Sequence, residues 1–376
     1  MSRLLHVVPG SASRAAKLFA GSTKDVLGRR EYFQSRHVPV EKLESPERSD
    51  TEVLNWLRSN DPSNYRVVLF EYEVYSNSMA YLRRSCPGTA ILMRSHNSNL
   101  PHFLDQFRGR ARIVSDGAAL PYVAPSEDAA EALRRFQLDA QCARLADYVL
   151  PITSWETDHY WAKLTAKDKV VTVPYFVPNC MGENVVITDK SDTIVFMMGA
   201  GGLMTPLLYD AGRNAVDIVN ALPGSVAKRW QFLMTGKIKP ADLFGRLGRI
   251  EPTGLLDSPL SIIAGARAVA ILSDLGMGFK TKLLEAAMAG CWLIVTPALM
   301  KRIPKCLRPW CLPVATNSPA QFARQLERIA REPPPSQDPN ALLRDEAFQA
   351  LDRILGPIMY PSADVRNIED AMRKSC

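Results

Sequence analysis

Short apolar runs alternate with helix-like patterns along almost the whole chain. In the first half, the apolar runs that predict strands are residues 4–10, 65–72, 88–96, 146–153 and 169–175. In the second half, the corresponding runs are residues 193–199, 229–236, 248–254, 268–274 and 291–297. Because these runs alternate with helical segments, the pattern predicts an α/β protein with parallel sheets.

The helical patterns lie between these runs. They cover residues 126–148, 211–222, 258–266, 280–289, 318–331 and 341–355. The alternation breaks at residues 173–192, which carry prolines, Asn and Gly, and again at the proline-rich segment 331–340. We therefore predict one Rossmann-like domain at 1–178, a second at 179–335, and a linker with a helical tail at 336–376. Two such sheets facing each other leave a cleft at the carboxyl ends of their strands, where α/β folds bind ligands.

Composition bears on the number of domains, the type of partner and the cellular compartment. The 376 residues are enough for two domains, and the net charge of +7 favours an anionic partner, although the bases are spread along the chain. The seven cysteines are scattered and lack the Cys and His spacing of a zinc site. No run approaches the roughly 18 apolar residues of a membrane span. These features predict a cytoplasmic protein in a reducing compartment, with no bound metal and no cofactor.

Lysines stand where one predicted helix begins, between two buried strands. The strand at 268–274 is followed by Gly276 and Gly278, and then by Lys280 and Lys282. Glycines allow the backbone to approach a ligand closely, and the amides of a helix start attract anions.

Glu285 follows on the same helix, where a carboxylate can accept hydrogen bonds from the two hydroxyls of a ribose. The pattern therefore predicts a site for a nucleoside diphosphate. The alternative is that the lysines are solvated and that Glu285 pairs with Lys282.

The same segment, GMGFKTKLLEAAMAGCWLIVTP (276–297), resembles the signature G-x-G-x-K-x-K-L-L-E-A-x-A-x-G of family 4-type glycosyltransferases with the GT-B fold. Other stretches agree: residues 196–223 resemble a strand, loop and helix of that family, 232–237 its second strand, and 173–179 its interdomain hinge. The resemblance implies two facing Rossmann-like domains and an enzyme that uses a nucleotide sugar as donor, such as a UDP-, GDP- or dTDP-sugar.

The resemblance also implies which residues bind the donor. They are Gly199, Gly202, Lys237, Gly276, Gly278, Lys280, Thr281, Lys282, Leu283 and Glu285. Basic side chains and helix-start amides would stabilise the leaving diphosphate without a metal, so Lys282 is expected to act in catalysis. The family's reaction retains the anomeric configuration.

Two features depart from the family pattern. Met277 stands where the family usually has a second glutamate, eight residues before the one that holds the ribose. The contact of that glutamate with the donor sugar is therefore unassigned. The loop at 199–202 also lacks the arginine of the usual diphosphate clamp, which Lys237 and Lys282 are expected to replace.

Smaller signals lie at the strand ends of the first half. In the stretch MRSHNSNLPH, the resemblance places His96 near the reacting sugar, which makes it a candidate catalytic residue. The alternative is a histidine that only satisfies polar groups at a strand end. Arg94 and Asn97 are expected on the acceptor side, together with Gly10 and Ser11 in the turn after the first strand.

Three local expectations concern the surrounding segments. His102 is expected in a loop, Ser154 and Glu156 as the cap of a helix, and Tyr160 and Trp161 in the core.

The sequence suggests a limited set of partners. They are a nucleotide-sugar donor and a glycan, lipid-linked or small-molecule acceptor. The basic clusters at 108–112 and 301–310 could contact an acceptor pyrophosphate or the inner face of an anionic membrane, or could be solvated loops. No nucleic-acid-binding motif is present. The rival functions are a non-catalytic nucleotide-sugar-binding protein and a Rossmann oxidoreductase, although no G-x-G-x-x-G follows the first strand.

Overall fold

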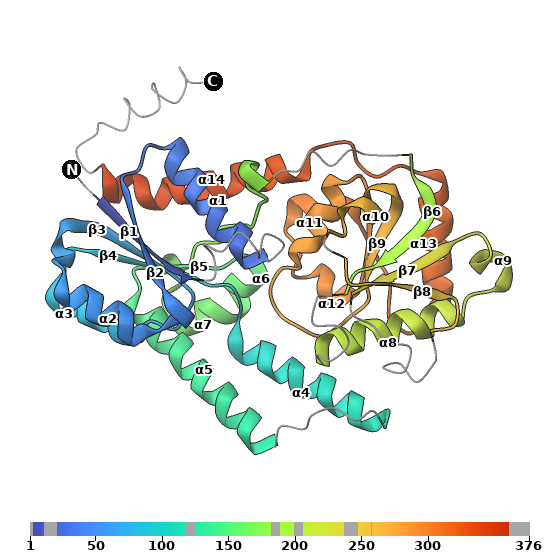
Figure 1. Cartoon of the computed structure of the whole chain (residues 1–376), viewed down its shortest axis with the longest axis horizontal. Coiled ribbons are helices and arrows are strands. Elements are labelled where there is room, and N and C mark those ends of the chain that lie inside the picture. Colours follow the sequence, from blue (N-terminus) through green and yellow to red (C-terminus); the bar gives the residue numbers. More distant parts are fainter. Residues whose placement is uncertain are drawn as a thin grey trace.

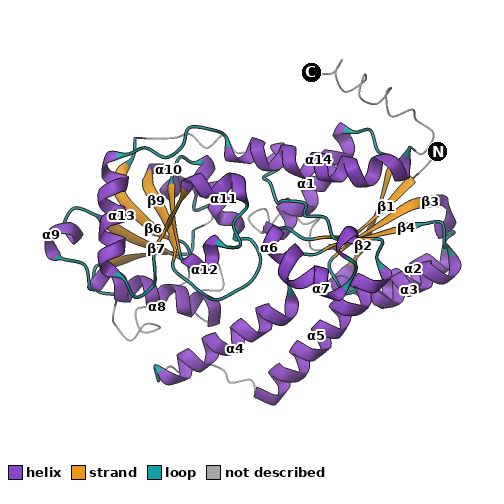
Figure 2. Ribbon diagram, turned by 180° about the vertical axis from the view of Figure 1, so that it is seen from behind, coloured by secondary structure: helices purple, strands orange, loops and turns teal. Residues whose placement is uncertain are grey.

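The computed structural model describes residues 3–10, 21–117, 125–181, 189–198, 206–236, 247–256 and 258–360. Two α/β halves lie side by side, each built on a sheet flanked by helices (Figure 1), and the view from behind shows the same division (Figure 2). The apolar runs of the sequence form the strands, since their side chains are almost entirely buried.

The N-terminal half contains a five-stranded parallel sheet with the order β2-β1-β3-β4-β5. Its strands are β1 (Arg3–Pro9), β2 (Val40–Ser45), β3 (Tyr65–Glu71), β4 (Ala90–Arg94) and β5 (Tyr148–Leu150). Glu71 and Arg94 pair in register at the ends of β3 and β4. The register therefore brings two charged residues together at one edge of the sheet.

The C-terminal half contains a six-stranded parallel sheet with the order β11-β10-β9-β6-β7-β8. Its strands are β6 (Ser191–Phe196), β7 (Gln231–Thr235), β8 (Ile250–Gly254), β9 (Ala266–Ile271), β10 (Trp292–Val295) and β11 (Cys311–Pro313). This is a doubly wound order whose direction reverses between β6 and β9, and such a reversal is where these folds bind nucleotides.

Helices cover both sheets. In the N-terminal half they are α1 (Gly21–Ser35), α2 (Asp50–Ser59), α3 (Ser76–Ser85), α4 (Asn99–Ser115), α5 (Pro125–Leu145), α6 (Ser154–Glu156) and α7 (Ala162–Leu164). In the C-terminal half they are α8 (Pro206–Asn220), α9 (Gly224–Ala227), α10 (Leu260–Gly265), α11 (Thr281–Met288), α12 (Pro297–Met300) and α13 (Pro319–Arg331).

The last described helix, α14 (Pro339–Met359), returns to the N-terminal half and runs beside α1 (Figure 1). Asp352 on α14 accepts hydrogen bonds from Tyr32 and Arg36 of α1. The segment predicted as a helical tail is therefore packed against the first domain.

Most predicted elements are present, and the differences have local causes. The run at 169–175 is not a strand: only Val170 forms an isolated bridge, to Val149, and Pro174 removes a backbone donor. Strand β2 was not predicted because it is an edge strand with mostly exposed side chains, so it shows no apolar run. Strand β11 is only three residues long.

The local expectations are partly confirmed. Tyr160 and Trp161 lie in the core, as predicted. His102 lies on α4 rather than in a loop. The cap before Glu156 is made by Thr153, not Ser154, because the Thr153 hydroxyl accepts the Glu156 amide in a capping box. Among the described helices, none is both long enough and apolar enough to cross a membrane.

Candidate active site

The loop between β9 and α11 turns through two glycines. The φ angles of Gly276 and Gly278 are +88° and +78°, a region that side chains disfavour. A Cβ on Gly278 would lie 2.8 Å from Oδ1 of Asn97, which follows β4. The glycine therefore lets this loop lie directly against the end of an N-terminal strand. The predicted residues Gly278 and Asn97 come together here.

The starts of α1 and α11 meet beside this loop. A Cβ on Gly21 would lie 2.5 Å from Oγ1 of Thr281, so the two first turns touch. Both helices present the positive ends of their dipoles to this region. Lys280 is the N-cap residue of α11, and burial, followed by the charge of Arg302, lowers the pKa of its ammonium to about 8. The predicted diphosphate region thus combines two helix starts with a poorly solvated cation.

Lys282 and Glu285 lie on the first turns of α11. Nζ of Lys282 donates to the carbonyl of Met198 at 2.8 Å, just after β6, and burial lowers its pKa. Glu285 is 9% exposed and accepts a hydrogen bond from Nζ of Lys24 at 2.5 Å. The pairing of Glu285 with Lys24, on α1, replaces the alternative pairing with Lys282. This ion pair joins the two halves of the molecule.

Two of the predicted donor-binding groups are used inside the protein. Leu283 is fully buried, and its amide donates to the carbonyl of Lys280 at 2.9 Å. The amide of Gly276 donates to Oδ2 of Asp105, on α4, at 2.8 Å. Both amides therefore have partners within the protein, and the donor contacts expected of Gly276 and Leu283 stay predictions. Four other candidates, Ser11, Gly199, Gly202 and Lys237, lie outside the described residues.

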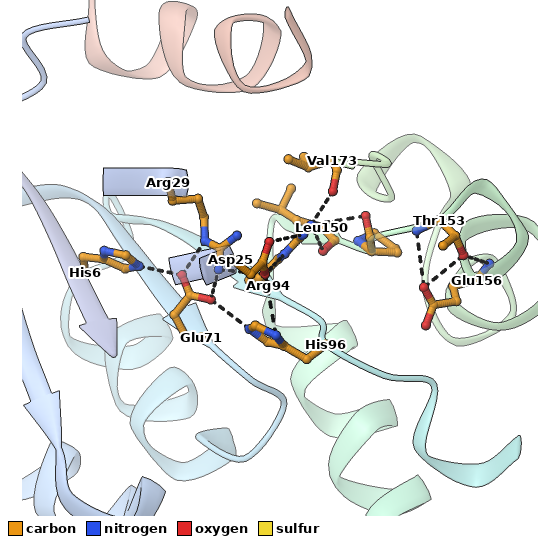
Figure 3. Close-up of polar contacts among 11 residues, drawn as sticks. His6, Asp25, Arg29, Glu71, Arg94, His96, Leu150, Thr153, Glu156 and Val173 are labelled. Atoms are coloured by element: carbon orange, nitrogen blue, oxygen red, sulfur yellow. Dashed lines mark hydrogen bonds and ion pairs between the residues drawn. The ribbon is translucent and has the colours of Figure 1, made fainter. Parts of the chain in front are cut away.

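A network of buried charges lies at the ends of β3 and β4 (Figure 3). Its members are His6, Asp25, Arg29, Glu71, Arg94 and His96. Arg29 donates to both carboxylate oxygens of Glu71, and Arg94 donates to those of Asp25 at 2.8 and 2.9 Å. Because Asp25 and Arg29 lie four residues apart on α1, one helix turn supplies two of the network's six members.

His96 closes the network on the side of the β9–α11 loop. Its Nε2 lies 3.1 Å from Oε2 of Glu71, and its Nδ1 lies 3.6 Å from Oδ2 of Asp25. The ring also stacks on Tyr72, with 3.9 Å between ring centroids. Burial lowers the pKa of His96, against the opposing effect of the two carboxylates. The ring is therefore held on three sides, while the backbone carbonyl of His96 and the side chain of Asn97 lie next to Gly278.

The carboxylates of the network are strongly ionised. Burial alone would raise the pKa of Asp25, but Arg29, Arg94 and His96 outweigh it and hold that pKa well below its usual range. The same balance lowers the pKa of Glu71, where Arg29 is the main opposing charge.

The prediction that Arg94 lies on the acceptor side is corrected. Arg94 is fully buried, and besides Asp25 its guanidinium donates to the carbonyls of Leu150, Pro151 and Val173. These bonds connect the end of β4 to the end of β5 and to the segment 169–175, so its role is to position the network.

The network also contains a set of groups that resembles a metal site. Asp25, Glu71 and His96 each bring one potential ligand atom within 4.8 Å of the others. However, Arg29 and Arg94 already neutralise both carboxylates and occupy their oxygens. The arrangement therefore suits a salt-bridge network better than a dication, which would be repelled by two guanidinium groups.

Gly10 lines a cavity of about 890 Å³ in the N-terminal half. Its charged lining is of both signs and comprises Glu44, Glu47, Arg48, Asp50, Arg134 and Arg135. Arg48 stacks on Tyr72, 3.7 Å from the ring centroid, and Tyr72 in turn stacks on His96. A continuous stack thus connects this cavity to the candidate catalytic histidine.

Several site residues escaped the sequence analysis. Glu71 gave one usable signal, because a charged residue ends an otherwise apolar strand. Asp25 and Arg29 gave another, the i,i+4 spacing of opposite charges. Lys24 gave no signal, since its partner Glu285 is far away in the sequence, and Arg302 appeared only as part of the basic cluster 301–310.

Known proteins were compared with the chain at the level of sequence and of structure. No protein-family model matches the sequence, and no curated protein is similar to it. Among solved structures, sucrose-phosphate synthase from Thermosynechococcus elongatus is similar at 13% identity, with 98% of this chain and 100% of that chain covered and a TM-score of 0.57.

Two further structures share the architecture over nearly their whole length. HepE from Anabaena, determined in complex with UDP, is 11% identical, with 99% of each chain covered and a TM-score of 0.53. The lipopolysaccharide outer core galactosyltransferase WaaB is 13% identical, with 99% of this chain and 100% of that chain covered and a TM-score of 0.53. The predicted fold is confirmed: the chain has the GT-B architecture of two Rossmann-like domains.

Proposed function

We propose that this chain is a glycosyltransferase that moves a sugar from a nucleotide-sugar donor to an acceptor. The observation that carries the proposal is the start of α11. There Lys282 and Glu285 lie one turn apart, next to the β6–β9 reversal and against the first turn of α1. This arrangement offers cations and helix dipoles to a diphosphate and a carboxylate to a ribose.

The donor is best sought among UDP-sugars first. One HepE structure, with a TM-score of 0.51, was determined in complex with UDP-glucose, and HepE shares this fold. GDP- and dTDP-sugars are the next candidates. A ligand at about 100 times its dissociation constant stabilises a protein by roughly 2.7 kcal/mol, so a thermal-shift screen of the three classes will identify the nucleotide.

Glu285→Gln tests the site directly. The amide keeps the shape of the side chain but removes the charge that strengthens hydrogen bonds to the ribose, so nucleotide affinity should fall about tenfold. Isothermal titration calorimetry measures the loss, and circular dichroism checks that the fold is kept. Glu332→Gln, in an exposed pair with Arg328, is the matched control and should bind normally. Unchanged affinity in Glu285→Gln would remove the basis of the proposal.

The proposed mechanism uses the positive charge of the site rather than a metal. Lys282 and the start of α11 stabilise the negative charge that develops on the leaving diphosphate. His96 is placed near the reacting sugar in this mechanism, with its ring oriented by Glu71 and Asp25. His96→Ala should lower kcat by about 100-fold while changing nucleotide affinity little. The family resemblance supports transfer with retention, which NMR of the product anomer tests.

The acceptor is proposed to lie on the N-terminal side, near Gly10 and Asn97. The cavity that Gly10 lines mixes carboxylates and guanidinium groups, a lining that suits the many hydroxyls of a glycan. Contact with an anionic membrane at its inner face remains part of the proposal. Arg302, however, is buried and cannot contribute to it, and Arg112 pairs with Asp210.

A second function is favoured by one residue. Met277 replaces the family's glutamate, which would fit a protein that binds a nucleotide sugar without transferring it. A turnover assay with the selected donor and a panel of glycan acceptors separates the two functions.

A further inference from the structure

Arg302 is a buried cation without a full set of partners. It follows α12 and is 3% exposed. Its Nη1 lies 3.9 Å from the sulfur of Met277, and its Nη2 has no hydrogen-bond partner among the described residues. A guanidinium that is shielded from water and incompletely paired costs free energy, so its presence requires a reason.

His102 lies in the same cluster. Its Nε2 accepts a hydrogen bond from the amide of Gln106 at 3.0 Å, so the neutral ring carries its hydrogen on Nδ1. That Nδ1 is also buried and, within the described ranges, without a partner. Burial, followed by the nearby charge of Lys280, lowers the pKa of His102 to about 4, and Arg302 adds to the effect. The cluster therefore holds two unsatisfied donors.

Lys280 adds a second full charge. Its Nζ lies only 3.0 Å from where a Cβ on Gly276 would be, so the side chain folds back over the loop beside Met277. After burial, Arg302 is the main charge that lowers the pKa of Lys280. Like charges in one buried place indicate that an anion belongs there.

The carboxylates that act on Arg302 are Asp105, Glu156 and the exposed Asp274, which accepts a hydrogen bond from Thr316. Asp105 accepts the amide of Gly276 and a guanidinium N–H of Arg108. Glu156 accepts bonds from Thr153 and Ser98. These acids moderate the positive charge without making a hydrogen bond to Arg302, and a guanidinium cannot neutralise itself by losing a proton. An anionic ligand would complete the hydrogen bonding of Arg302.

The position of the cluster separates it from the nucleotide end of the site. Lys282 is directed to the carbonyl of Met198 after β6, and Glu285 is paired with Lys24. Lys280 and Arg302 instead gather around Met277, on the preceding loop. On the proposed function, with the ribose at Glu285 and the diphosphate at the start of α11, the transferred sugar lies beyond the diphosphate, toward this loop.

We propose that Arg302, with Lys280 and His102, binds a carboxylate on the transferred sugar, so that the donor is a nucleotide-activated hexuronate rather than a neutral hexose. This inference rests on the proposed function. Arginine pairs with carboxylates through two parallel hydrogen bonds, which would satisfy Nη2. Methionine at position 277 fits the same purpose, because a glutamate there would repel the sugar carboxylate and would itself neutralise Arg302.

Calorimetric titration of uridine, UDP, UDP-glucose and UDP-glucuronate tests the proposal. If the screen selects another base, the matching hexose and hexuronate pair is used. The wild-type protein should bind the hexuronate at least about tenfold more tightly than the hexose, as expected for a charge-assisted pair. Arg302→Gln should abolish this preference while changing UDP affinity less than twofold. Arg302→Lys keeps the charge and should retain part of the preference. It also serves as a control for misfolding caused by loss of the cation.

Met277→Glu gives an independent test in the opposite direction, because it should weaken hexuronate binding and leave the hexose unaffected. Lys305→Gln, at an exposed position of the same segment, is the control and should behave as the wild type.

Three results would overturn the inference. Equal wild-type affinity for hexose and hexuronate would show that no carboxylate is recognised. An equal loss of UDP and UDP-glucuronate binding in Arg302→Gln would make Arg302 a ligand of the diphosphate. A wild type that binds none of the nucleotides would remove the proposed function as well, whereas in the first two cases UDP still binds and that function stands.

Discussion

The two sheets end in charged clusters of opposite character. At the ends of β3 and β4, each buried charge has a partner: Arg29 with Glu71 and Arg94 with Asp25. At the end of β9, Lys280 and Arg302 lie together, and part of the Arg302 guanidinium has no partner among the described residues. Paired buried charges hold elements of a fold in place, whereas a local excess of one sign of charge favours the binding of a ligand of the opposite sign.

A third cluster shows how a buried acid without a cation is accommodated. Glu73 and Asp139 are both buried and are bridged by the side-chain amide of Asn99, at 2.7 and 2.8 Å. Burial, followed by the charge of Asp139, raises the pKa of Glu73 to about 8, and burial raises the pKa of Asp139 to about 7. Each of these acids can become neutral by binding a proton, whereas the guanidinium of Arg302 cannot become neutral by losing one. The acid pair is therefore stable without a ligand, and the proposed role of Arg302 is to bind one.

Removing one partner from the paired cluster should have the largest effect. Arg94→Met leaves the carboxylate of Asp25 buried with less compensation and frees three carbonyls, so unfolding should require about 3–5 kcal/mol less free energy. Urea denaturation followed by circular dichroism measures it. Arg328→Met, in the exposed pair with Glu332, is the control and should stay within about 0.5 kcal/mol. A loss below about 1 kcal/mol in Arg94→Met would contradict the structural role of the network.

The acid pair predicts an unusual pH dependence. Carboxyls whose pKa is higher in the folded state than in the unfolded state keep their protons on folding, so their contribution to stability is lost as pH rises from about 4.5 to 8. Glu73→Gln cannot ionise and should be about 1–2 kcal/mol more stable than the wild type at pH 8, with little difference at pH 4.5. Thermal unfolding at both pH values measures the contrast. Equal effects at both would exclude protonation as the cause.

The same arginine-to-methionine change in the C-terminal cluster should have the opposite effect on the free energy of unfolding. Arg302→Met removes a buried cation that lacks full pairing and adds an apolar side chain beside Met277, so stability should be unchanged or increase by about 1 kcal/mol. Urea denaturation without ligand measures this. A loss as large as that of Arg94→Met would mean that Arg302 is a structural residue.

The smallest effect is expected from metal removal. Because Arg29 and Arg94 already occupy the carboxylates of Asp25 and Glu71, adding EDTA, Mg²⁺ or Mn²⁺ should shift the melting temperature by less than about 1 °C and leave turnover unchanged. A metal-dependent rate would contradict both the structural interpretation of the network and the proposed metal-independent mechanism.

Local patterns point to one part of the candidate site. The glycine turn, the lysines and Glu285 lie within ten residues, so helix capping, dipole and side-chain spacing apply to them directly. The same locality explains the failures. Edge strand β2 lacks an apolar stripe, and the run at 169–175 has one without becoming a strand, because pairing depends on neighbouring strands.

What the sequence alone determined is the α/β class, the two-domain order and the glycine turn before α11 with its lysines, since these follow from periodicity and local chemistry. The tertiary structure decided which charges are paired. Lys24 meets Glu285 across 261 positions, and Arg94 meets Asp25 across 69. Whether a buried charge is compensated depends on these distant contacts, and it is this property that divides the structural network from the cluster around Arg302.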